Sequence, residues 1–279
     1  MAFQRRAGDG LNYQHCRYGS SRVLFRGPSP DLTQDYITFL GGTETYGRFI
    51  PTPFPALLQG RVAPGCVNFG LTNAGLDLFL NDADVLGIAA QARVRILQIL
   101  GAQNMSNRFY QVHPRRNDRF LRASDRLCQL YPEVDFTEFH FIRHMLGHLA
   151  QLSQERYGQV VAELRTAWVA RMRHILMVLE APVVLLWFAD HAPPDHEVPD
   201  LRHDPLFITR AMLDAVRPHA ADLVEVPCSD QALCDGTQGM VFAENEAEAA
   251  ALLLGPRAHH EAAEALLPVL RPHLRRDAA

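Results

Sequence analysis

The segment from Gly41 to Gly47, Gly-Gly-Thr-Glu-Thr-Tyr-Gly, places two hydroxyl groups and a carboxylate directly after an apolar run and just before an expected helix. Open α/β proteins carry their chemistry at such strand-to-helix turns. A threonine hydroxyl becomes a nucleophile only where a base lies close to it. The question is therefore which other polar side chains the fold would bring to Thr43.

Three more polar loops each follow an apolar run. They are Gly70-Leu-Thr-Asn-Ala-Gly75, the segment 101–108, and the pair Asp190-His191. The carboxyl ends of parallel strands share one edge of a sheet, and ligands bind there where the strand order reverses. The sequence therefore predicts that four distant segments form one pocket.

The order of these loops resembles the SGNH, or GDSL-like, hydrolase superfamily. Its first block, Gly-Asp-Ser-x-Thr-Tyr-Gly, is similar to 41–47, with Gly42 in place of the aspartate and Thr43 in place of the serine. Its second and third blocks, Asn-x-Gly-x-x-Gly and Gly-x-Asn-Asp, are similar to 67–75 and 101–104. The resemblance implies that Thr43 is the nucleophile and that an oxyanion is stabilised by the Asn73 N–H together with the side chain of Gln103 or Asn104. Asparagine tolerates the left-handed backbone that this glycine position uses.

The last block of the family, Asp-x-x-His, stands just before the last helix. Here His259 and His260 lie in the first turn of that helix, without the aspartate. The resemblance implies that one of them is the base, with Asp190 or Glu44 supplying the missing carboxylate. A helix N-terminus disfavours imidazolium, so we expect a neutral ring.

The remaining pocket residues are expected to contact the substrate; they are Gly42, Glu44, Thr45, Tyr46, Gly70, Arg108 and His191. The departures from the family pattern fall on the chemistry itself. They indicate either altered chemistry or a binding protein on a hydrolase-like scaffold. We also expect the chain to fall within a bacterial family without an assigned function.

Several of these residues have structural interpretations as well. Thr43 and Thr45 could cap the following helix, with Glu44 favourable at its positive end. His259 and His260 could be a surface pair in a first helical turn. The arginines 115, 119, 122 and 126 recur at helical spacing near Arg108 and Arg116, as in a salt-bridged solvated face or a clamp for an acidic sugar, phosphate or sulfate. Arg108 lies nearest the predicted pocket.

Two groups of histidines have spacings that suggest a metal. His140, His144 and His148 recur every four residues, a zinc-ligand spacing on a helix, but the outer two would lie about 12 Å apart along the axis. Helix packing or a polar stripe is the favoured interpretation, and the same holds for the loop histidines 191, 196 and 203. No metal or other cofactor is therefore expected.

Five apolar runs rich in Val, Ile, Leu and Phe predict buried strands at 36–41, 65–70, 93–100, 182–189 and 222–227. Helical patterns alternate with them at 54–62, 76–91, 157–179, 205–217, 246–254 and 257–270. This alternation predicts a three-layer α/β/α fold with a five-stranded parallel sheet of flavodoxin-like order. We expect an N-terminal arm over 1–35 packed on one SGNH-like domain over 36–279, with insertions at 102–155 and 190–204.

Composition narrows the function classes. The net charge of −4 argues against a nucleic-acid partner, and no run approaches the roughly 20 apolar residues of a membrane helix. All 27 cationic side chains are arginines, which we attribute to coding bias. The five cysteines lack a paired CxxC spacing, and the N-terminus lacks an apolar signal region, so a cytoplasmic location is expected.

These observations lead to one functional expectation with a rival. The first is an esterase, acyl hydrolase or acyltransferase acting on an ester or acyl group, with a carbohydrate as the expected carrier. The rival is a non-catalytic protein that binds a glycan or an anionic ligand in the same pocket. The partner is in either case a small molecule or a glycan, and the oligomeric state is left open.

Overall fold

The computed structural model describes residues 10–180, 182–196 and 201–274. Parts of three predicted segments lie outside these residues: 1–9 of the arm, 197–200 of the loop 190–204, and 275–279 at the end of the domain. The largest sheet has five parallel strands in the order β2-β1-β3-β6-β7. Their bounds are β1 Tyr36–Gly41, β2 Gly65–Gly70, β3 Arg95–Gln98, β6 Val183–Ala189 and β7 Asp222–Pro227.

The strand order confirms the predicted fold class, because the chain adds β2 on one side of β1 and then reverses to add β3, β6 and β7 on the other. This is the flavodoxin-like arrangement, with its switch point between β1 and β3. Every residue of β1 and β6 is buried, as the continuous apolar runs of a sheet covered on both faces require. The register pairs Leu40 with Phe69 on one side and with Leu97 on the other.

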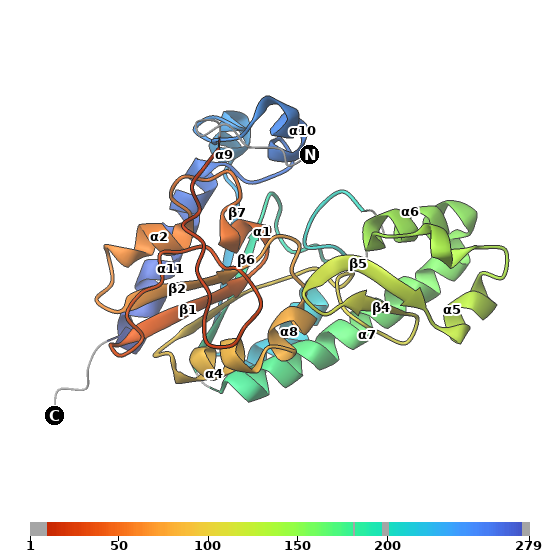
Figure 1. Ribbon diagram of the computed structural model, residues 1–279, viewed down its shortest axis with the longest axis horizontal. Coiled ribbons are helices and arrows are strands. Elements are labelled where there is room, and N and C mark those ends of the chain that lie inside the picture. The colour runs from red at the N-terminus through yellow and green to blue at the C-terminus, as the bar shows by residue number, and fades with distance from the viewer. Residues whose placement is uncertain (1–9, 181, 197–200, 275–279) are drawn as a thin grey trace.

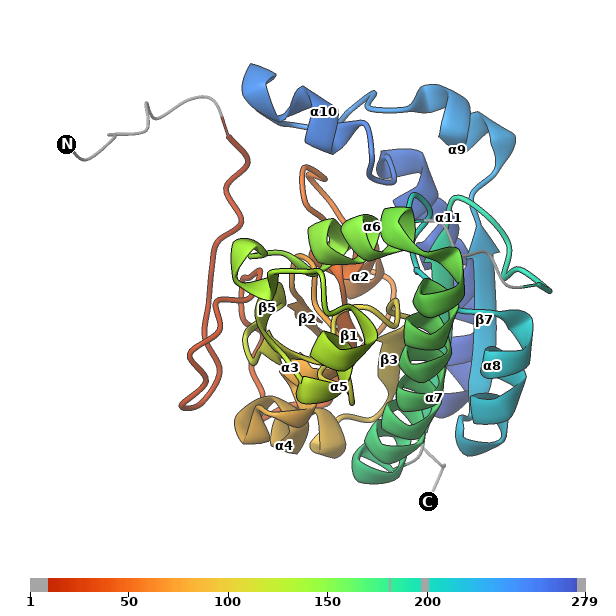
Figure 2. The same ribbon diagram turned by 90° about the vertical axis from the view of Figure 1, so that its right-hand side faces the viewer.

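Helices cover both faces of this sheet (Figures 1 and 2). One face packs against α2 (Phe54–Gln59) and α11 (Pro256–Leu274), and the other against α3 (Leu76–Leu80), α4 (Ala83–Gln91), α7 (Gln154–Leu179) and α8 (Arg210–Val216). The short helix α1 (Thr43–Tyr46) follows β1 directly. At the upper end of Figure 2, beyond the carboxyl ends of the strands, lie α6 (Ile142–Leu152), α9 (Asp230–Asp235) and α10 (Ala247–Ala250).

All six predicted helices differ from the structure in at least one bound. The pattern over 76–91 splits into α3 and α4, because the Asp82 carboxylate accepts a hydrogen bond from the Val85 N–H (3.2 Å) and caps a new helix. The helix expected from 205 begins only at Arg210, where the Thr209 hydroxyl accepts from the Met212 N–H (3.4 Å). The helix expected over 246–254 is reduced to α10, preceded by a 3-10 turn at Glu244–Glu246.

The segment 102–155 carries a second, two-stranded sheet of β4 (Tyr110–His113) and β5 (Arg116–Ala123). The helical interpretation of the arginine spacing was therefore wrong for Arg119 and Arg122, which lie on a strand, and for Arg115, which lies in the turn before it. Turn residues Pro114 and Arg115 reverse the chain, so antiparallel pairing replaces the helix. The helix α5 (Asp125–Leu130), a 3-10 turn at Phe136–Glu138 and α6 follow.

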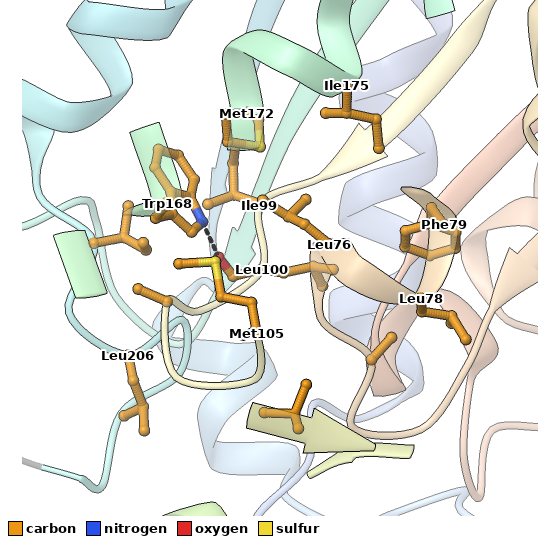
Figure 3. Close-up of a cluster of buried hydrophobic side chains, with 14 of the residues drawn as sticks. Leu76, Leu78, Phe79, Ile99, Leu100, Met105, Trp168, Met172, Ile175 and Leu206 are labelled. Carbon is orange, nitrogen blue, oxygen red and sulfur yellow. Dashed lines mark hydrogen bonds between the residues drawn. The ribbon is translucent and has the colours of Figure 1, made fainter. Parts of the chain in front are cut away.

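A cluster of buried side chains fastens α7 to the loop that follows β3 (Figure 3). The indole Nε1–H of Trp168 donates to the backbone oxygen of Leu100 (2.7 Å). Met172 and Ile175 pack one and two turns further along the same helix. The start of the loop that carries Gln103 and Asn104 is thus held by a buried hydrogen bond.

The described part of the N-terminal arm lies across the end of the sheet at β2. Cys16 and Phe25 form an antiparallel bridge, and the rings of Tyr18 and Phe25 lie 5.0 and 5.1 Å from that of Phe69. Arg26 is buried and donates to the backbone oxygens of Gly47 (2.6 Å) and Pro51 (2.8 Å). The arm therefore also holds the chain that leaves α1. Among the described residues, no helix is long and apolar enough to cross a membrane.

Candidate active site

The turn from β1 into α1 is built around the side chain of Gln98, at the end of β3. Its Oε1 accepts from the N–H of Gly42 (2.9 Å), the N–H of Thr45 (3.3 Å) and the hydroxyl of Thr45 (2.5 Å). Its Nε2 donates to Oε2 of Glu44 (3.3 Å). One buried amide therefore satisfies the first orphan N–H groups of α1 in place of a capping hydroxyl.

This arrangement decides what the two threonines do. Gly42 is the N-cap residue and no side chain caps α1, so the capping interpretation of Thr43 and Thr45 does not hold. Thr45 is fully buried against Gln98 and has a structural role. Thr43 is only half-buried, and its hydroxyl points to the loop after β2.

The hydroxyl of Thr43 meets the backbone of Asn73. The Asn73 N–H donates to Thr43 Oγ1 at 3.1 Å, and Asn73 has the positive φ of 56° that lets its N–H take this direction. The side-chain amide of Asn104 donates in turn to the Asn73 carbonyl (3.0 Å). Loops that follow three neighbouring strands therefore meet at Asn73.

The loop that carries Asn73 is braced on both sides. The Asn68 side chain donates to the Thr45 carbonyl (2.8 Å) and accepts from the Gly70 N–H (2.8 Å). A Cβ at Gly70 would clash with the backbone of Tyr46, so α1 can approach β2 only because this residue is glycine. On the other side, Asn117 of β5 accepts from the N–H of Gly75 (2.9 Å). Hydrogen bonds therefore hold both ends of the loop that carries Asn73.

Glu44, next to Thr43, carries the most perturbed carboxyl group of this edge. Burial raises its pKa to about 7, and the nearby carboxylates of Asp204 and Asp190 add to the shift. Asp204 itself is held by Arg143 (2.6 Å). A carboxyl group with a pKa near neutrality can both take up and release a proton at physiological pH.

A second polar group stands at the carboxyl end of β6. Asp190 Oδ1 lies 2.6 Å from His191 Nδ1, and Asp190 Oδ2 lies 3.2 Å from His203 Nδ1. These two histidine contacts lower the pKa of Asp190, chiefly through the hydrogen bond with His191. Asp190 therefore pairs with the loop histidines and not with those of α11.

The histidines of α11 do not reach Thr43. His259 is buried; its Nδ1 accepts from the Phe54 N–H (3.2 Å), and its ring packs against Phe54 and Phe188. Burial, followed by the charges of Arg26 and His260, lowers its pKa to about 3. His260 is exposed. Since His259 satisfies the first N–H of α2, the expectation that it or His260 serves as base to Thr43 is corrected: the described residues place neither ring at that hydroxyl.

Three more predicted site residues are engaged elsewhere. Gln103 donates to Asp204 Oδ1 at the long distance of 3.5 Å, and its backbone oxygen accepts from the Tyr110 hydroxyl (2.7 Å), so of the two amides only Asn104 reaches the Asn73 loop. Arg108 pairs with Glu163 of α7 (2.9 Å). The Tyr46 hydroxyl lies 2.9 Å from His15 Nε2, and burial raises its pKa to about 12. Arg108 and Tyr46 therefore hold the scaffold together.

An open cleft of about 390 Å³ adjoins Asn73 on the side of the arm and the β4–β5 hairpin. It is lined by Arg22, Arg115 and Arg116 together with Asp118. In the part of the chain that the structure describes, Arg22, Arg115 and Arg116 form no ion pair with a carboxylate. A cationic lining next to Asn73 suits an anionic group.

The sequence over residues 1–274 matches a family described as Domain of unknown function (DUF6473). The chain belongs to this family. No curated protein matches it in sequence.

Solved structures offer only loose likenesses to this DUF6473 chain. The lipase Lip_vut3 from a goat rumen metagenome has a TM-score of 0.41 and 10% identity, over 84% of this chain and 96% of its own. A mutant of Axe2, an acetyl-xylooligosaccharide esterase from Geobacillus stearothermophilus, has a TM-score of 0.40 and 14% identity, over 88% and 96%. The fold assignment rests on the strand order of the sheet itself.

The sequence did not reveal Gln98 and Asp204 as site residues of this DUF6473 chain, and for His203 it favoured packing or a polar stripe over a metal. Gln98 lies inside the apolar run of β3, where a lone amide among Ile96, Leu97 and Ile99 was a usable signal, because a buried amide needs partners. His203 and Asp204 come to the edge through a loop whose path no periodicity predicts.

Cysteine is not a competing nucleophile at this edge. Cys228, directly after β7, is buried, and burial raises the pKa of its thiol to about 12. The thiol is therefore protonated at neutral pH, whereas the reactive form of cysteine is the thiolate.

Proposed function

We propose that this protein is an acyl hydrolase or acyltransferase that acts on an ester, with Thr43 as nucleophile and a carbohydrate as the expected acyl carrier. The observation that carries the proposal is the hydrogen bond from the Asn73 N–H to Thr43 Oγ1, 3.1 Å long, at a left-handed residue. A hydroxyl and a preorganised backbone donor at one point are the two parts that acyl transfer needs. The similarity of 41–47 to the first SGNH block supports the same assignment.

The general base of the proposal is Glu44. Glu44 occupies the same turn as Thr43, beside Gln98. Because His259 is in the core, a different group has to accept the proton of the Thr43 hydroxyl. The pKa near 7 gives Glu44 comparable populations of both protonation states at neutral pH. No hydrogen bond joins Glu44 to Thr43 among the described residues, so the proton would pass through one water or after substrate binding tightens the turn.

The proposed reaction then has two halves. Thr43 Oγ1 attacks the acyl carbon while Glu44 takes up the hydroxyl proton, and the Asn73 N–H, braced by Asn104, donates to the carbonyl oxygen as it becomes an oxyanion. The ester oxygen departs with the proton from Glu44 and leaves an acyl-Thr43 ester. Water completes hydrolysis, or a second alcohol completes transfer, by the reverse proton path.

A panel of acyl esters that includes acetylated sugars tests the nucleophile. We expect Thr43→Ala to lower kcat/KM at least 10²-fold and Thr43→Ser to retain activity, because serine keeps the hydroxyl. Thr166→Ala, at an exposed position of α7, is the matched control and should turn over ester like the wild type. Equal rates for wild type and Thr43→Ala would refute the assignment.

The arginine-lined cleft beside Asn73 favours a second candidate, a non-catalytic protein that binds an anionic glycan or other acidic ligand. The acidic glycan would contact Arg22, Arg115 and Arg116, with Asn73 at the edge of the cleft. Binding of sulfated and carboxylated oligosaccharides by wild type and Thr43→Ala separates the two candidates. Equal binding with no turnover of any ester by the wild type would favour the binder. The cytoplasmic setting expected from composition belongs to both proposals.

A further inference from the structure

Three ligand-type side chains converge at the carboxyl end of β6, outside the Thr43–Asn73 contact. Asp190 and His191 are consecutive residues, and His203 returns to them from the far side of the following loop. One nitrogen or oxygen atom from each lies within 4.8 Å of the others. The two histidines share one carboxylate, His191 on Oδ1 and His203 on Oδ2.

These separations are compatible with a first-row divalent ion. Such ions bind imidazole nitrogen and carboxylate oxygen at about 2.0–2.2 Å, so neighbouring ligand atoms stand about 3–4 Å apart around them. The contacts of Asp190 with His191 Nδ1 and His203 Nδ1, 2.6 and 3.2 Å, are of hydrogen-bond length, so the shorter one would widen around an ion. Metal binding would release any proton that the ligand atoms carry.

The residues around this cluster hold it in place. The buried indole of Trp187 donates to the His191 backbone oxygen (2.7 Å) and meets the imidazole edge-on, with ring centroids 5.6 Å apart. Asp204, adjacent to His203, is fixed by Arg143, which also donates to the Leu201 carbonyl (2.7 Å). These contacts hold the backbone of His191 and the loop segment beside His203.

The charge and exposure of the cluster also suit a cation. Asp190, Asp204 and Glu44 gather at one edge of the sheet, and two of them disfavour ionisation of the third. The side chains of Asp190, His191 and His203 are 39%, 32% and 53% exposed, so an ion held by them would keep room for water or substrate. Two histidines and one carboxylate form a known ligand set for Zn²⁺ and for Fe²⁺, and this set leaves coordination positions open.

We propose that Asp190, His191 and His203 form a binding site for a divalent transition-metal ion of the Zn²⁺ type, with the remaining coordination positions open to water. The site goes beyond the proposed acyl transfer and does not depend on it. Its position on the same sheet edge as Glu44 and Thr43 would place a positive charge beside the candidate catalytic turn.

Calorimetric titration of the chelator-treated full chain with ZnCl₂ tests the site. We expect one Zn²⁺ per chain, and at least a tenfold weaker affinity in both Asp190→Asn and His203→Asn. The matched control is His196→Asn, a histidine of the same loop that lies outside the cluster, which should bind like the wild type. Co²⁺ substitution provides a second measurement, since its visible absorption bands should appear in the wild type and in His196→Asn and be lost in His203→Asn.

Two results would overturn the site: wild type that takes up less than half an equivalent of Zn²⁺, or cluster variants that bind it as the wild type does. Circular dichroism verifies that each variant is folded, and the exposure of His203 makes its replacement the safest for the fold. Ester turnover is measured on the same samples. Zinc binding without ester turnover would support the metal site and count only against the proposed acyl transfer. Ester turnover without zinc binding would support acyl transfer and count against the metal site.

Discussion

The first turns of α1 and α11 each bury a titratable side chain near the same end of the sheet, and burial shifts their pKa values in opposite directions. It raises the carboxyl of Glu44 to about 7 and lowers the imidazole of His259 to about 3. In both, the neutral form is favoured, because removal from water disfavours charge. The outcome for chemistry differs: Glu44 exchanges a proton near neutrality, whereas His259 stays a neutral hydrogen-bond acceptor.

The neighbours of the two side chains explain the difference in role. Glu44 lies among ionisable groups, with Gln98 donating to it and the carboxylates of Asp190 and Asp204 acting on it. His259 lies between Phe54 and Phe188 and satisfies the N–H that starts α2. A histidine at a helix start is therefore no sign of catalysis by itself, since it can equally complete a neighbouring helix.

The largest expected effect comes from removing the charge of Glu44. Glu44→Gln keeps the shape and the contact with Gln98, so we expect kcat/KM for an acyl ester to fall about 10²–10⁴-fold while the fold is retained. Steady-state kinetics on the ester panel measures this. Glu264→Gln, which removes only the exposed ion pair with Arg61, is the control with the same substitution. If Glu44→Gln retained activity within threefold of the wild type, the general base would be another residue.

His259 should matter for stability and not for turnover. His259→Ala leaves a cavity between two phenylalanines and an unsatisfied N–H at Phe54, so we expect a loss of about 3 kcal/mol in the free energy of unfolding. Urea denaturation measures it, and His260→Ala, the exposed neighbour, should change it by less than about 0.5 kcal/mol. If His259→Ala kept the stability of the wild type and lost turnover, His259 would be the candidate general base in place of Glu44.

The sheet could be predicted from the sequence much better than the site. Apolar runs such as 36–41 and 182–189 have one physical explanation, burial on both faces, and their order predicted the sheet. The contact between Thr43 and Asn73 joins loops after neighbouring strands, so its position followed from the strand order. His259 was placed wrongly because its position before the last helix gives the end of the sheet but not the direction of the ring.

Other parts of the site depend on long-range contacts that no local pattern reports. The spacing of Arg119 and Arg122 is typical of a helix, and only pairing with β4 places both residues on a strand. His203 reaches Asp190 across a loop, where chain length permits many paths. Such contacts are set by tertiary packing, whereas periodicity reports only which face of an element is buried.

The smallest effect, and the sharpest test of the comparison, is the pH dependence of stability. The folded chain retains the Glu44 proton between pH 4.5, its usual pKa, and about 7, so the contribution of Glu44 to stability falls as pH rises through that window. The unfolded chain retains the His259 proton between about pH 3 and 6.5, so the contribution of His259 falls as pH drops from 6.5 toward 3. Each slope is at most about 1.4 kcal/mol per pH unit.

Between pH 4.5 and 6.5 the two slopes have opposite signs, and in the wild type they largely cancel. Each should therefore become visible when the other residue is replaced. The difference in free energy of unfolding between Glu44→Gln and wild type should increase in favour of the variant as pH rises from 5 to 7, by about 2 kcal/mol in all. The same difference for His259→Gln should shift toward the wild type over this range, because the wild type regains the contribution of His259. Urea midpoints at four pH values measure both, with His260→Gln as the control for a surface histidine. Parallel pH profiles for wild type and both variants would mean that burial shifts neither pKa as described, and the contrast between the two turns would then rest on geometry alone.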